Sequence, residues 1–190
     1  MKSNSLRVLI LASLMVGLAG CRESKQVANL KQQLQSKKPS HRHRAAKVLG
    51  EMGPEAKDGV PALIEALKDS DAKVRQYAAR SLGRIGPVAK DAAPGLIEVL
   101  KDKDAKVREA AAQSLGKIGL DTDQAVPPLT EVLTDRDPKV RRAAVMSLAN
   151  HGAAAQTASP ALKKALKDNN REVRDAATIA LKRIDKVARN

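Results

Sequence analysis

The sequence predicts an all-α fold, an α-solenoid of about five two-helix repeats with a period of 33 residues. The pattern Asp-x-Lys-Val-Arg begins at residue 71, recurs at residues 104 and 137, and returns in a looser form at residue 170. Each copy leads into an Ala-rich run, and a glycine and a proline recur at the same interval. No gap is needed between the copies, so one structural unit is repeated along the chain.

Each unit is expected to hold two helices. The prolines lie at residues 61, 94, 127 and 160, and the glycines lie at residues 53, 86, 119 and 152. Each proline precedes a short apolar run and suits the first turn of a helix, where its missing amide hydrogen would have no partner. Each glycine follows an Ala-rich run and permits the left-handed turn that ends a helix. Asp185 stands where a fifth glycine would fall.

The second helix of each unit has one apolar face. In the unit that starts near residue 54, apolar residues lie at positions 74, 78, 82 and 85, which form one stripe along a helix. Shifting the frame back by one period aligns Leu30 with Leu63 and Leu34 with Leu67, so a degenerate first unit begins near residue 24. Single units cannot bury their apolar faces, and the repeats must stack on one another to be stable.

The first 21 residues have the layout of a secretory signal. Lys2 and Arg7 precede an apolar stretch over residues 8–16, and small residues follow it up to Cys21. The apolar stretch is shorter than the roughly 20 residues that a transmembrane helix needs, which makes a permanent transmembrane anchor the weaker interpretation. We therefore expect this segment to be removed from the mature protein.

Residues 18–21, Leu-Ala-Gly-Cys, resemble the lipobox of bacterial lipoproteins. The resemblance implies a signal peptide over residues 1–20, a lipidated Cys21 with a short tether over residues 21–23, and a solenoid over residues 24–190. It also implies an exported protein that is lipid-anchored to a bacterial membrane. Arg22 in place of an aspartate favours the outer membrane if the organism has two membranes. The alternative for this single cysteine is a free thiol or an intermolecular bridge.

The composition is basic and almost free of aromatic residues. The chain has 35 basic and 21 acidic residues. The expected signal peptide contains two of the basic residues and none of the acidic ones, so its cleavage would change the formal charge from +14 to +12. One Tyr and no Phe or Trp offer few stacking platforms for bases, sugars or cofactors. A basic chain suits nucleic acid, but the expected export makes nucleic acid an unexpected partner.

The unit Asp-x-x-Val-Arg-x-x-Ala-x-x-x-Leu-Gly-x-Ile-Gly resembles a HEAT-like repeat of the kind found in phycobilin lyases. The resemblance implies a hydrogen-bonded ladder of Asp and Arg between successive units, and binding to other macromolecules. It places these residues in the ladder: Asp71, Arg75, Asp104, Arg108, Asp137 and Arg141. Asn170 replaces the acid in the last unit, which implies a weaker ladder there.

The repeated arginines have two interpretations. An Asp four residues before an Arg can cap the helix and pair with the guanidinium, which serves only the fold. A row of phosphate ligands is the alternative, and the structural interpretation is favoured because it needs no ligand.

Exposed positions on the second helices are the better candidates for function, because the fold does not dictate them. They carry a mostly basic strip, and the HEAT-like resemblance implies that it lines a concave groove. The candidate groove residues are Lys73, Arg80, Arg84, Lys106, Lys117, Lys139 and Arg142. Glu65, Glu98 and Glu131 predict an acidic stripe on the opposite face. The alternative is that both faces are only solvated.

Metal, cofactor and catalytic sites are not expected. His41 and His43 lie two residues apart and point in different directions on a helix, so they do not readily share a metal ion. His151 stands where other units have Ile85 and Ile118, which indicates a tolerated substitution. We find no distinctive set of Ser, His and acid and no Gly-rich phosphate loop, so the sequence does not predict an enzyme.

Two functions follow from these patterns. The favoured one is a membrane-anchored scaffold or adaptor of the bacterial cell envelope that binds a protein partner through its solenoid surface. The alternative is an envelope-binding protein whose basic groove recognises anionic lipid, lipopolysaccharide or another acidic polymer. Binding of that second kind would weaken steeply with salt, because exposed charges are screened within about 10 Å at 0.1 M.

Overall fold

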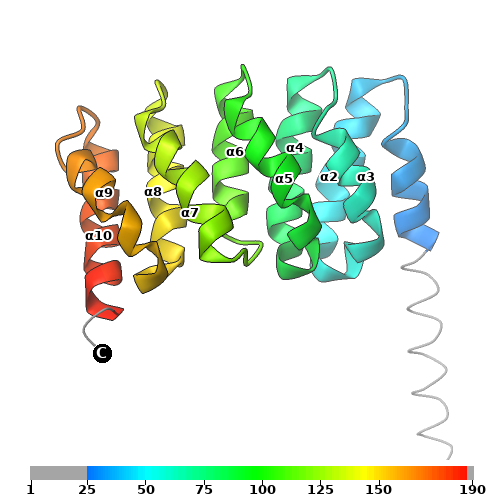
Figure 1. Cartoon of the computed structure of the whole chain (residues 1–190). Coiled ribbons are helices and arrows are strands. Elements are labelled where there is room, and N and C mark those ends of the chain that lie inside the picture. The colour runs from blue at the N-terminus through cyan, green and yellow to red at the C-terminus, as the bar shows by residue number, and fades with distance from the viewer. Residues whose placement is uncertain (1–24, 188–190) are drawn as a thin grey trace, which may run out of the picture.

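The structure is a computed structural model that describes residues 25–187, with side chains described through residue 184. The expected signal peptide, Cys21 and the tether over residues 21–23 lie outside the described residues. Within the described range the chain is helical and has no strand, which confirms the predicted all-α solenoid. Figure 1 shows helical pairs that follow one another along a single axis.

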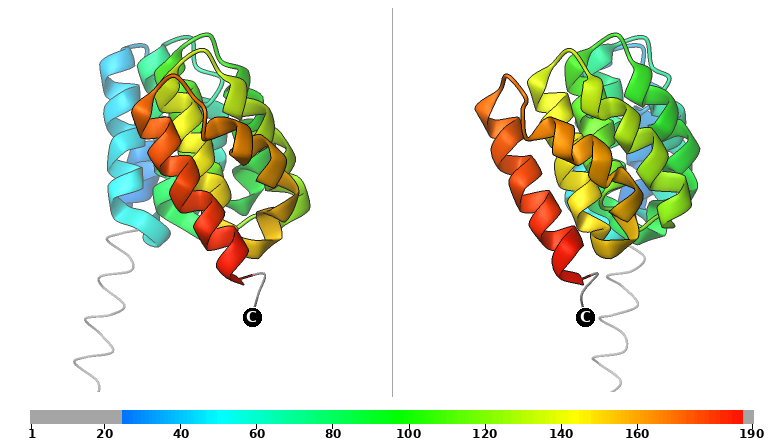
Figure 2. Two further views of the ribbon diagram at one scale, coloured as in Figure 1. Left: turned by 90° about the vertical axis from the view of Figure 1, so that its left-hand side faces the viewer. Right: turned by 60° about the vertical axis from the view of Figure 1, so that its left-hand side comes forward.

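The second helices of the pairs form one layer of the solenoid. They are α2 (Pro39–Met52), α4 (Ala72–Ile85), α6 (Ala105–Leu115), α8 (Pro138–Asn150) and α10 (Arg171–Val187). The first helices form the other layer, over residues 25–33 and in α3 (Val60–Ala66), α5 (Ala93–Glu98), α7 (Thr122–Glu131) and α9 (Ser159–Ala165). Short 3-10 segments join or extend them: η1 (Gly53–Gly59), η2 (Gly86–Ala92), η3 (Val99–Lys101), η4 (Val132–Thr134) and η5 (Gly152–Ala158). Figure 2 shows α10 tilted relative to α2, so the stack twists along its length.

The repeated aspartates begin the second helices, as the sequence predicts. The Asp71 carboxylate accepts hydrogen bonds from the backbone amides of Lys73 and Val74, at 2.9 and 3.0 Å. Asp104 caps α6 in the same way, and Asp137 caps α8 by accepting from the backbone amide of Lys139. These bonds satisfy amides in the first turn that have no partner within the helix.

All four repeated glycines have a positive φ, and Gly53 and Gly86 cap α2 and α4, which confirms their predicted role as helix stops. Helix α6 is instead capped by Gly116 and α8 by His151, before Gly119 and Gly152. The φ angles are +66° at Gly53, +78° at Gly86, +67° at Gly119 and +56° at Gly152. The expected left-handed helical turn is wrong in detail, because ψ is −140° at Gly53 and −144° at Gly86. That combination of angles is essentially restricted to glycine. With Asp185 in the fifth place, α10 continues to Val187 and is the longest second helix, at 17 residues.

Three of the four repeated prolines lie in the first turn of a first helix, as predicted: Pro61, Pro94 and Pro160. The prediction is wrong for Pro127, which lies inside α7 together with Pro128. The second, third and fifth units bend before the first helix, for example at Ala56 (φ −82°, ψ 16°). The fourth unit lacks such a 3-10 segment, so its helix begins earlier, at Thr122, and includes both prolines.

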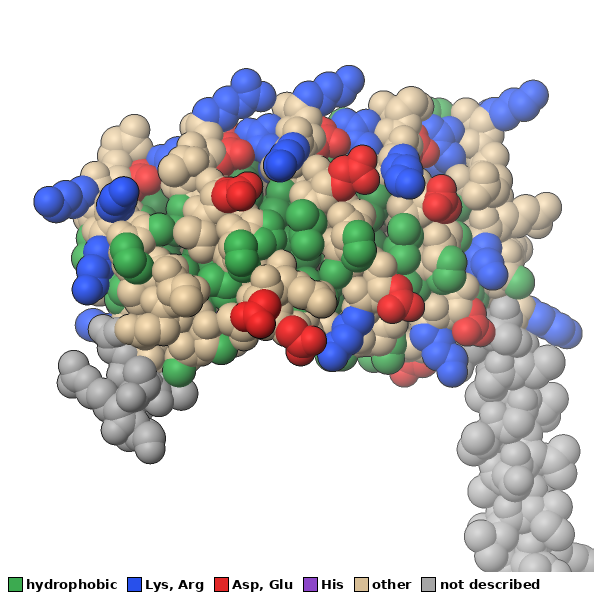
Figure 3. Space-filling view, in the orientation of Figure 1, with side chains coloured by type: hydrophobic (Ala, Val, Ile, Leu, Met, Phe, Trp, Pro, Cys, Tyr) green, Lys and Arg blue, Asp and Glu red, His purple; other side chains and the backbone are tan. Residues whose placement is uncertain are grey.

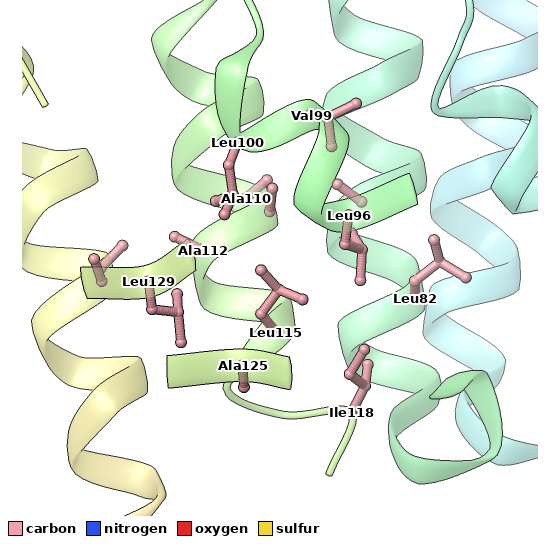
Figure 4. Close-up of a cluster of buried hydrophobic side chains, with 14 of the residues drawn as sticks. Leu82, Leu96, Val99, Leu100, Ala110, Ala112, Leu115, Ile118, Ala125 and Leu129 are labelled. Carbon is pink, nitrogen blue, oxygen red and sulfur yellow. The ribbon is translucent and has the colours of Figure 1, made fainter. Parts of the chain in front are cut away.

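The core lies between the two layers and runs without a break through the stack. The predicted stripe of α4 is buried, with Val74, Ala78 and Leu82 fully inaccessible to solvent. Leu30 and Leu34 are also buried, which confirms that a degenerate first unit belongs to the solenoid. Figure 4 shows Leu82, Leu96 and Leu115 in a cluster formed by neighbouring units.

Neighbouring second helices approach closely through a glycine and a serine. A Cβ atom added to Gly83 in α4 would lie 2.8 Å from the Cα atom of Ser114 in α6. Ser114 is buried, and its hydroxyl donates to the Ala79 carbonyl at 2.7 Å. Equivalent pairs join α2 to α4 and α6 to α8: Gly50 with Ser81, and Gly116 with Ser147. These contacts hold successive second helices close together.

Candidate binding face

Arginines of one unit bind aspartates of the next unit. Arg75 in α4 donates from Nε and Nη2 to the two carboxylate oxygens of Asp102, at 2.7 and 2.9 Å. Its Nη1 donates to the carbonyls of Asp69 and Ser70 in the preceding turn, at 2.8 and 3.1 Å. One guanidinium therefore links the helix–helix turns of two successive units.

This ion pair recurs through the stack. The equivalent pairs are Arg42 with Asp69, Arg108 with Asp135, and Arg141 with Asp168. All these side chains are only 6–12% exposed. Each aspartate also accepts a hydrogen bond from the backbone amide two residues later. The ladder is thus a set of mostly buried, hydrogen-bonded ion pairs.

The acidic members of the ladder differ from those expected. Asp71, Asp104 and Asp137 do not pair with the arginines, because their carboxylates accept from backbone amides at the helix starts. The actual partners lie two residues earlier, at positions 69, 102, 135 and 168. The expected weakening at Asn170 is also wrong, because Asp168 supplies the carboxylate and binds Arg141 at 2.7 Å.

The ladder also sets the protonation of its carboxyl groups. Burial raises the pKa of Asp102, but hydrogen bonds from Arg75 and the Asp104 amide outweigh it and lower the pKa below its ordinary value. The same balance lowers the pKa values of Asp69 and Asp135. For Asp168 the hydrogen bond from Arg141 is the largest effect, and it lowers the pKa against burial. Because the guanidiniums already bind protein groups, the geometry supports the structural interpretation of the arginine row over phosphate binding.

The candidate groove residues lie on the solvent side of the second helices, which we call the second-helix face. Arg80 is half-buried, and the other six are exposed: Lys73, Arg84, Lys106, Lys117, Lys139 and Arg142. Acidic residues are interspersed among them. Glu172 lies 3.8 Å from Arg142, and Glu109 accepts a hydrogen bond from Gln113.

A hollow of about 580 Å³ lies on the second-helix face over α4 and α6. It brings together four of the predicted basic residues: Lys73, Arg80, Lys106 and Lys139. Three acidic residues also line it: Asp104 and Asp137, which cap helix starts, and Glu109, which accepts a hydrogen bond from Gln113. Arg84, Lys117 and Arg142 do not line this hollow.

The same face holds an aromatic pair that the sequence analysis missed. The rings of His43 in α2 and Tyr77 in α4 stack, with centroids 5.6 Å apart and planes 22° apart. The sequence singles out Tyr77 as the one aromatic residue available to a partner and indicates for His43 only that it does not share a metal ion with His41, so the stack itself is not predicted. His43 lies 33 residues before Gln76, which is the neighbour of Tyr77 in the sequence. This spacing is the signal that could have indicated the pair.

The opposite face carries a different surface. The predicted acidic stripe is exposed there, at Glu65, Glu98 and Glu131. Figure 3 looks onto this face and shows acidic side chains spread over it beside a band of hydrophobic ones. A hollow of about 470 Å³ between α5 and α7 is lined partly by Ile97 and Pro128.

Two further features bear on function. Among the described residues, no group of three or more His, Cys, Asp and Glu side chains could hold a metal ion. Within the same part of the chain, every helix falls short of the length and hydropathy needed to cross a membrane.

The two-layered stack, the inter-unit ladder and the exposed second-helix face define a helical repeat scaffold. The sequence matches the HEAT-repeat family over residues 27–116, 60–149 and 126–189. These matches span nearly all the described residues, and the chain belongs to the HEAT-repeat family. It has no match among curated protein sequences.

Solved structures with similar folds include a phycocyanin lyase complex and engineered or designed proteins. The phycocyanin lyase complex of CpcE and CpcF from Nostoc sp. PCC7120 gives a TM-score of 0.71 at 32% identity, over 83% of this chain and 64% of that one. An engineered protein gives a TM-score of 0.69 at 28% identity, over 84% and 79% of the two chains. A designed armadillo repeat protein in complex with the peptide (KR)4 gives 0.67 at 21% identity, over 82% and 80%, and shows the fold alone.

Proposed function

We propose that the protein is a lipid-anchored scaffold of the bacterial cell envelope that binds another protein through its second-helix face. The observation that carries this proposal is the hollow over α4 and α6, where four basic side chains gather beside Tyr77. The repeat architecture does not require basic residues at these exposed positions. Solenoids use extended surfaces of this kind to bind partners.

The anchor is inferred from the first 21 residues. The lipobox-like segment that ends at Cys21 supports removal of residues 1–20 and lipidation of the new N-terminus. Each buried methylene of an acyl chain contributes roughly 0.8 kcal/mol, so several chains on one residue hold a protein firmly on a membrane. Arg22 favours the outer membrane where two membranes exist.

A second candidate function is binding of anionic lipid, lipopolysaccharide or another acidic polymer. The net positive charge of the chain favours it. The second-helix face, however, mixes acidic and apolar side chains with the basic ones, such as Glu109, Glu172 and Ile179. A uniformly anionic surface would repel the acidic side chains, so the mixed face favours a protein partner.

The test is photo-crosslinking in membranes that contain the full-length lipoprotein. In one variant, four residues of the second-helix face are reversed together: Arg80→Glu, Arg84→Glu, Lys106→Glu and Lys117→Glu. A matched control reverses four exposed lysines on η1, η2 and α9: Lys57→Glu, Lys90→Glu, Lys163→Glu and Lys164→Glu. We expect one specific protein to be crosslinked by the parent and the control and lost in the face variant. Loss of bound anionic lipid or polymer alone would replace this proposal with the second one.

A further inference from the structure

The second-helix face changes character along the solenoid axis. One row of equivalent positions runs down its centre, with one residue from each of α2, α4, α6, α8 and α10: Lys47, Arg80, Gln113, Met146 and Ile179. The row thus passes from cationic through neutral polar to apolar. A neighbouring row follows the same trend, with Arg44, Tyr77, Ala110, Ala143 and Ala176.

The apolar end of these rows is accessible to a partner. Ile179 is 47% exposed, although a branched aliphatic side chain of this size is usually buried. Met146 is partly buried against the core. Ala143 and Ala176 are 5% and 4% exposed, and their short side chains form the floor beside the longer ones.

The cationic end offers charges that lie close together. Lys73 and Arg80 in α4 line the same hollow as Lys106 in α6 and Lys139 at the start of α8. Glu109 in α6 is the one acid there that does not cap a helix. Toward the other end, Glu172 lies 3.8 Å from Arg142, and Asp175 lies 3.6 Å from Arg171. In α2, Glu51 likewise lies 3.5 Å from Lys47, so the two ends differ through the central row and not through the presence of acidic side chains.

We propose that the partner presents an extended segment with acidic residues over α2, α4 and α6 and apolar residues over α8 and α10. This inference rests on the proposed function and names the chemistry and orientation of its ligand. Packed helices lie about 8–10 Å apart, so four steps from α2 to α10 span roughly 40 Å. At about 3.3 Å per residue, such a segment would be about 12 residues long.

An extended peptide fits this face better than a lipid surface does. Anionic headgroups would bind the basic side chains, which include Lys139 and Arg142 in α8, but they give no reason for apolar side chains at the central positions of α8 and α10. A peptide with an acidic and an apolar half matches both ends at once, and the charge difference fixes its orientation.

The test uses fluorescent 12-residue peptides and the full-length lipoprotein in discs of neutral lipid. One probe has five Glu residues at one end and three Leu residues at the other. A second probe replaces the Leu residues with Ser, and a third replaces the Glu residues with Gln. We expect the first probe to bind about tenfold more tightly than either of the others.

Variants at each end of the face separate the two contributions. Met146→Lys with Ile179→Lys should weaken the acidic–apolar probe about tenfold and leave the acidic–Ser probe unweakened. Arg80→Glu should weaken both. Leu166→Lys changes another exposed apolar residue, at 39% exposure in the turn after α9, and serves as a control without effect. A photoreactive group should crosslink to α2 or α4 from the acidic end and to α8 or α10 from the apolar end.

Several outcomes would overturn the inference. If the acidic–Ser probe binds as tightly as the acidic–apolar probe, or if the crosslinks show no preference for either end, the proposed orientation is wrong. Capture of a protein through the second-helix face could then still hold. Competition by anionic vesicles with equal effect on all acidic probes would assign the face to lipid. If no probe binds and the four-residue face variant still captures its protein partner, the proposed role of the face fails as well.

Discussion

The Arg75 guanidinium binds both carboxylate oxygens of Asp102, a residue that lies 27 positions later in the next repeat. Both side chains are 8% exposed. A mostly buried charge without its partner is costly, so each half of this pair depends on the other.

Asp102→Asn is expected to lower the free energy of unfolding by roughly 3–5 kcal/mol, because it leaves the Arg75 charge uncompensated in a mostly buried site. The matched control is Asp104→Asn, which should cost far less because asparagine caps helices about as well as aspartate. Urea unfolding followed by circular dichroism measures both. Equal losses in the two variants would contradict the ladder described here.

Acid should destabilise the protein through the four ladder carboxyl groups. The pKa values of these groups are lowered in the folded state, so the groups contribute fully to stability when the pH is above their unfolded-state pKa, about 3.9. This contribution is lost as the pH falls through the lower folded-state pKa values. Urea midpoints measured between pH 5 and pH 2.5 should fall most steeply below about pH 4. A flat profile in that range would show that the carboxylates are not stabilised.

His151→Ile is expected to stabilise the protein. Burial lowers the pKa of His151, and within the described structure its Nε2 atom has no hydrogen-bond partner. Equivalent residues Ile85 and Ile118 are fully buried in their units. The gain should be about 1–3 kcal/mol, the usual cost of an unsatisfied buried polar group.

The gain from His151→Ile should also depend on pH. The unfolded histidine takes up a proton below about pH 6.5, whereas the folded one resists it, so the parent loses stability as the pH falls from 7 toward 5. The isoleucine variant lacks this loss. Thermal unfolding at pH 7.5 and pH 5.5 measures the difference, and a gain that does not grow at the lower pH would argue against a buried neutral imidazole.

Gly83→Ala is expected to cost about 1–3 kcal/mol, because the added Cβ atom would clash with the Ser114 Oγ atom and lie 2.8 Å from its Cα atom, forcing α4 and α6 apart. In the interface between α8 and α10, alanines occupy both positions equivalent to Gly83 and Ser114, at 149 and 180, and both are buried. This natural Ala–Ala pair suggests a second substitution as the control. Ser114→Ala in the Gly83→Ala background should recover part of the loss. A double-mutant cycle would show this coupling, and strictly additive effects would refute it.

Cys21→Ser is expected to leave the helical domain folded and to abolish membrane attachment, because the lipidated thiol is the proposed anchor. Partition of the parent and the variant between detergent and aqueous phases measures attachment, and circular dichroism of the variant checks its fold. Continued partition of the variant into detergent would disprove the lipoprotein hypothesis.

The period made most of the architecture predictable from the sequence. It aligned Leu30 and Leu34 with core positions of later units, and both are buried. It also identified the aspartates that begin helices and the glycines that end them. These features depend on local backbone requirements, which residue type and spacing express directly.

Contacts between units were harder to predict. Asp69 and Asp71 recur with the same period, and only the three-dimensional structure distinguishes the carboxylate that reaches back to Arg42 from the one that caps its own helix. The His43–Tyr77 stack was missed because its residues come from different units. Periodicity relates equivalent residues, whereas these contacts join non-equivalent ones.

The direction of the ladder has a consequence for how the gene can change. Every rung takes its arginine from one unit and its aspartate from the following unit, as Arg108 does with Asp135. Duplicating a complete 33-residue unit would therefore create one more rung and preserve all the others, while deleting part of a unit would break the register. The length of the solenoid can therefore change by whole repeats without breaking the ion pairs between the remaining units.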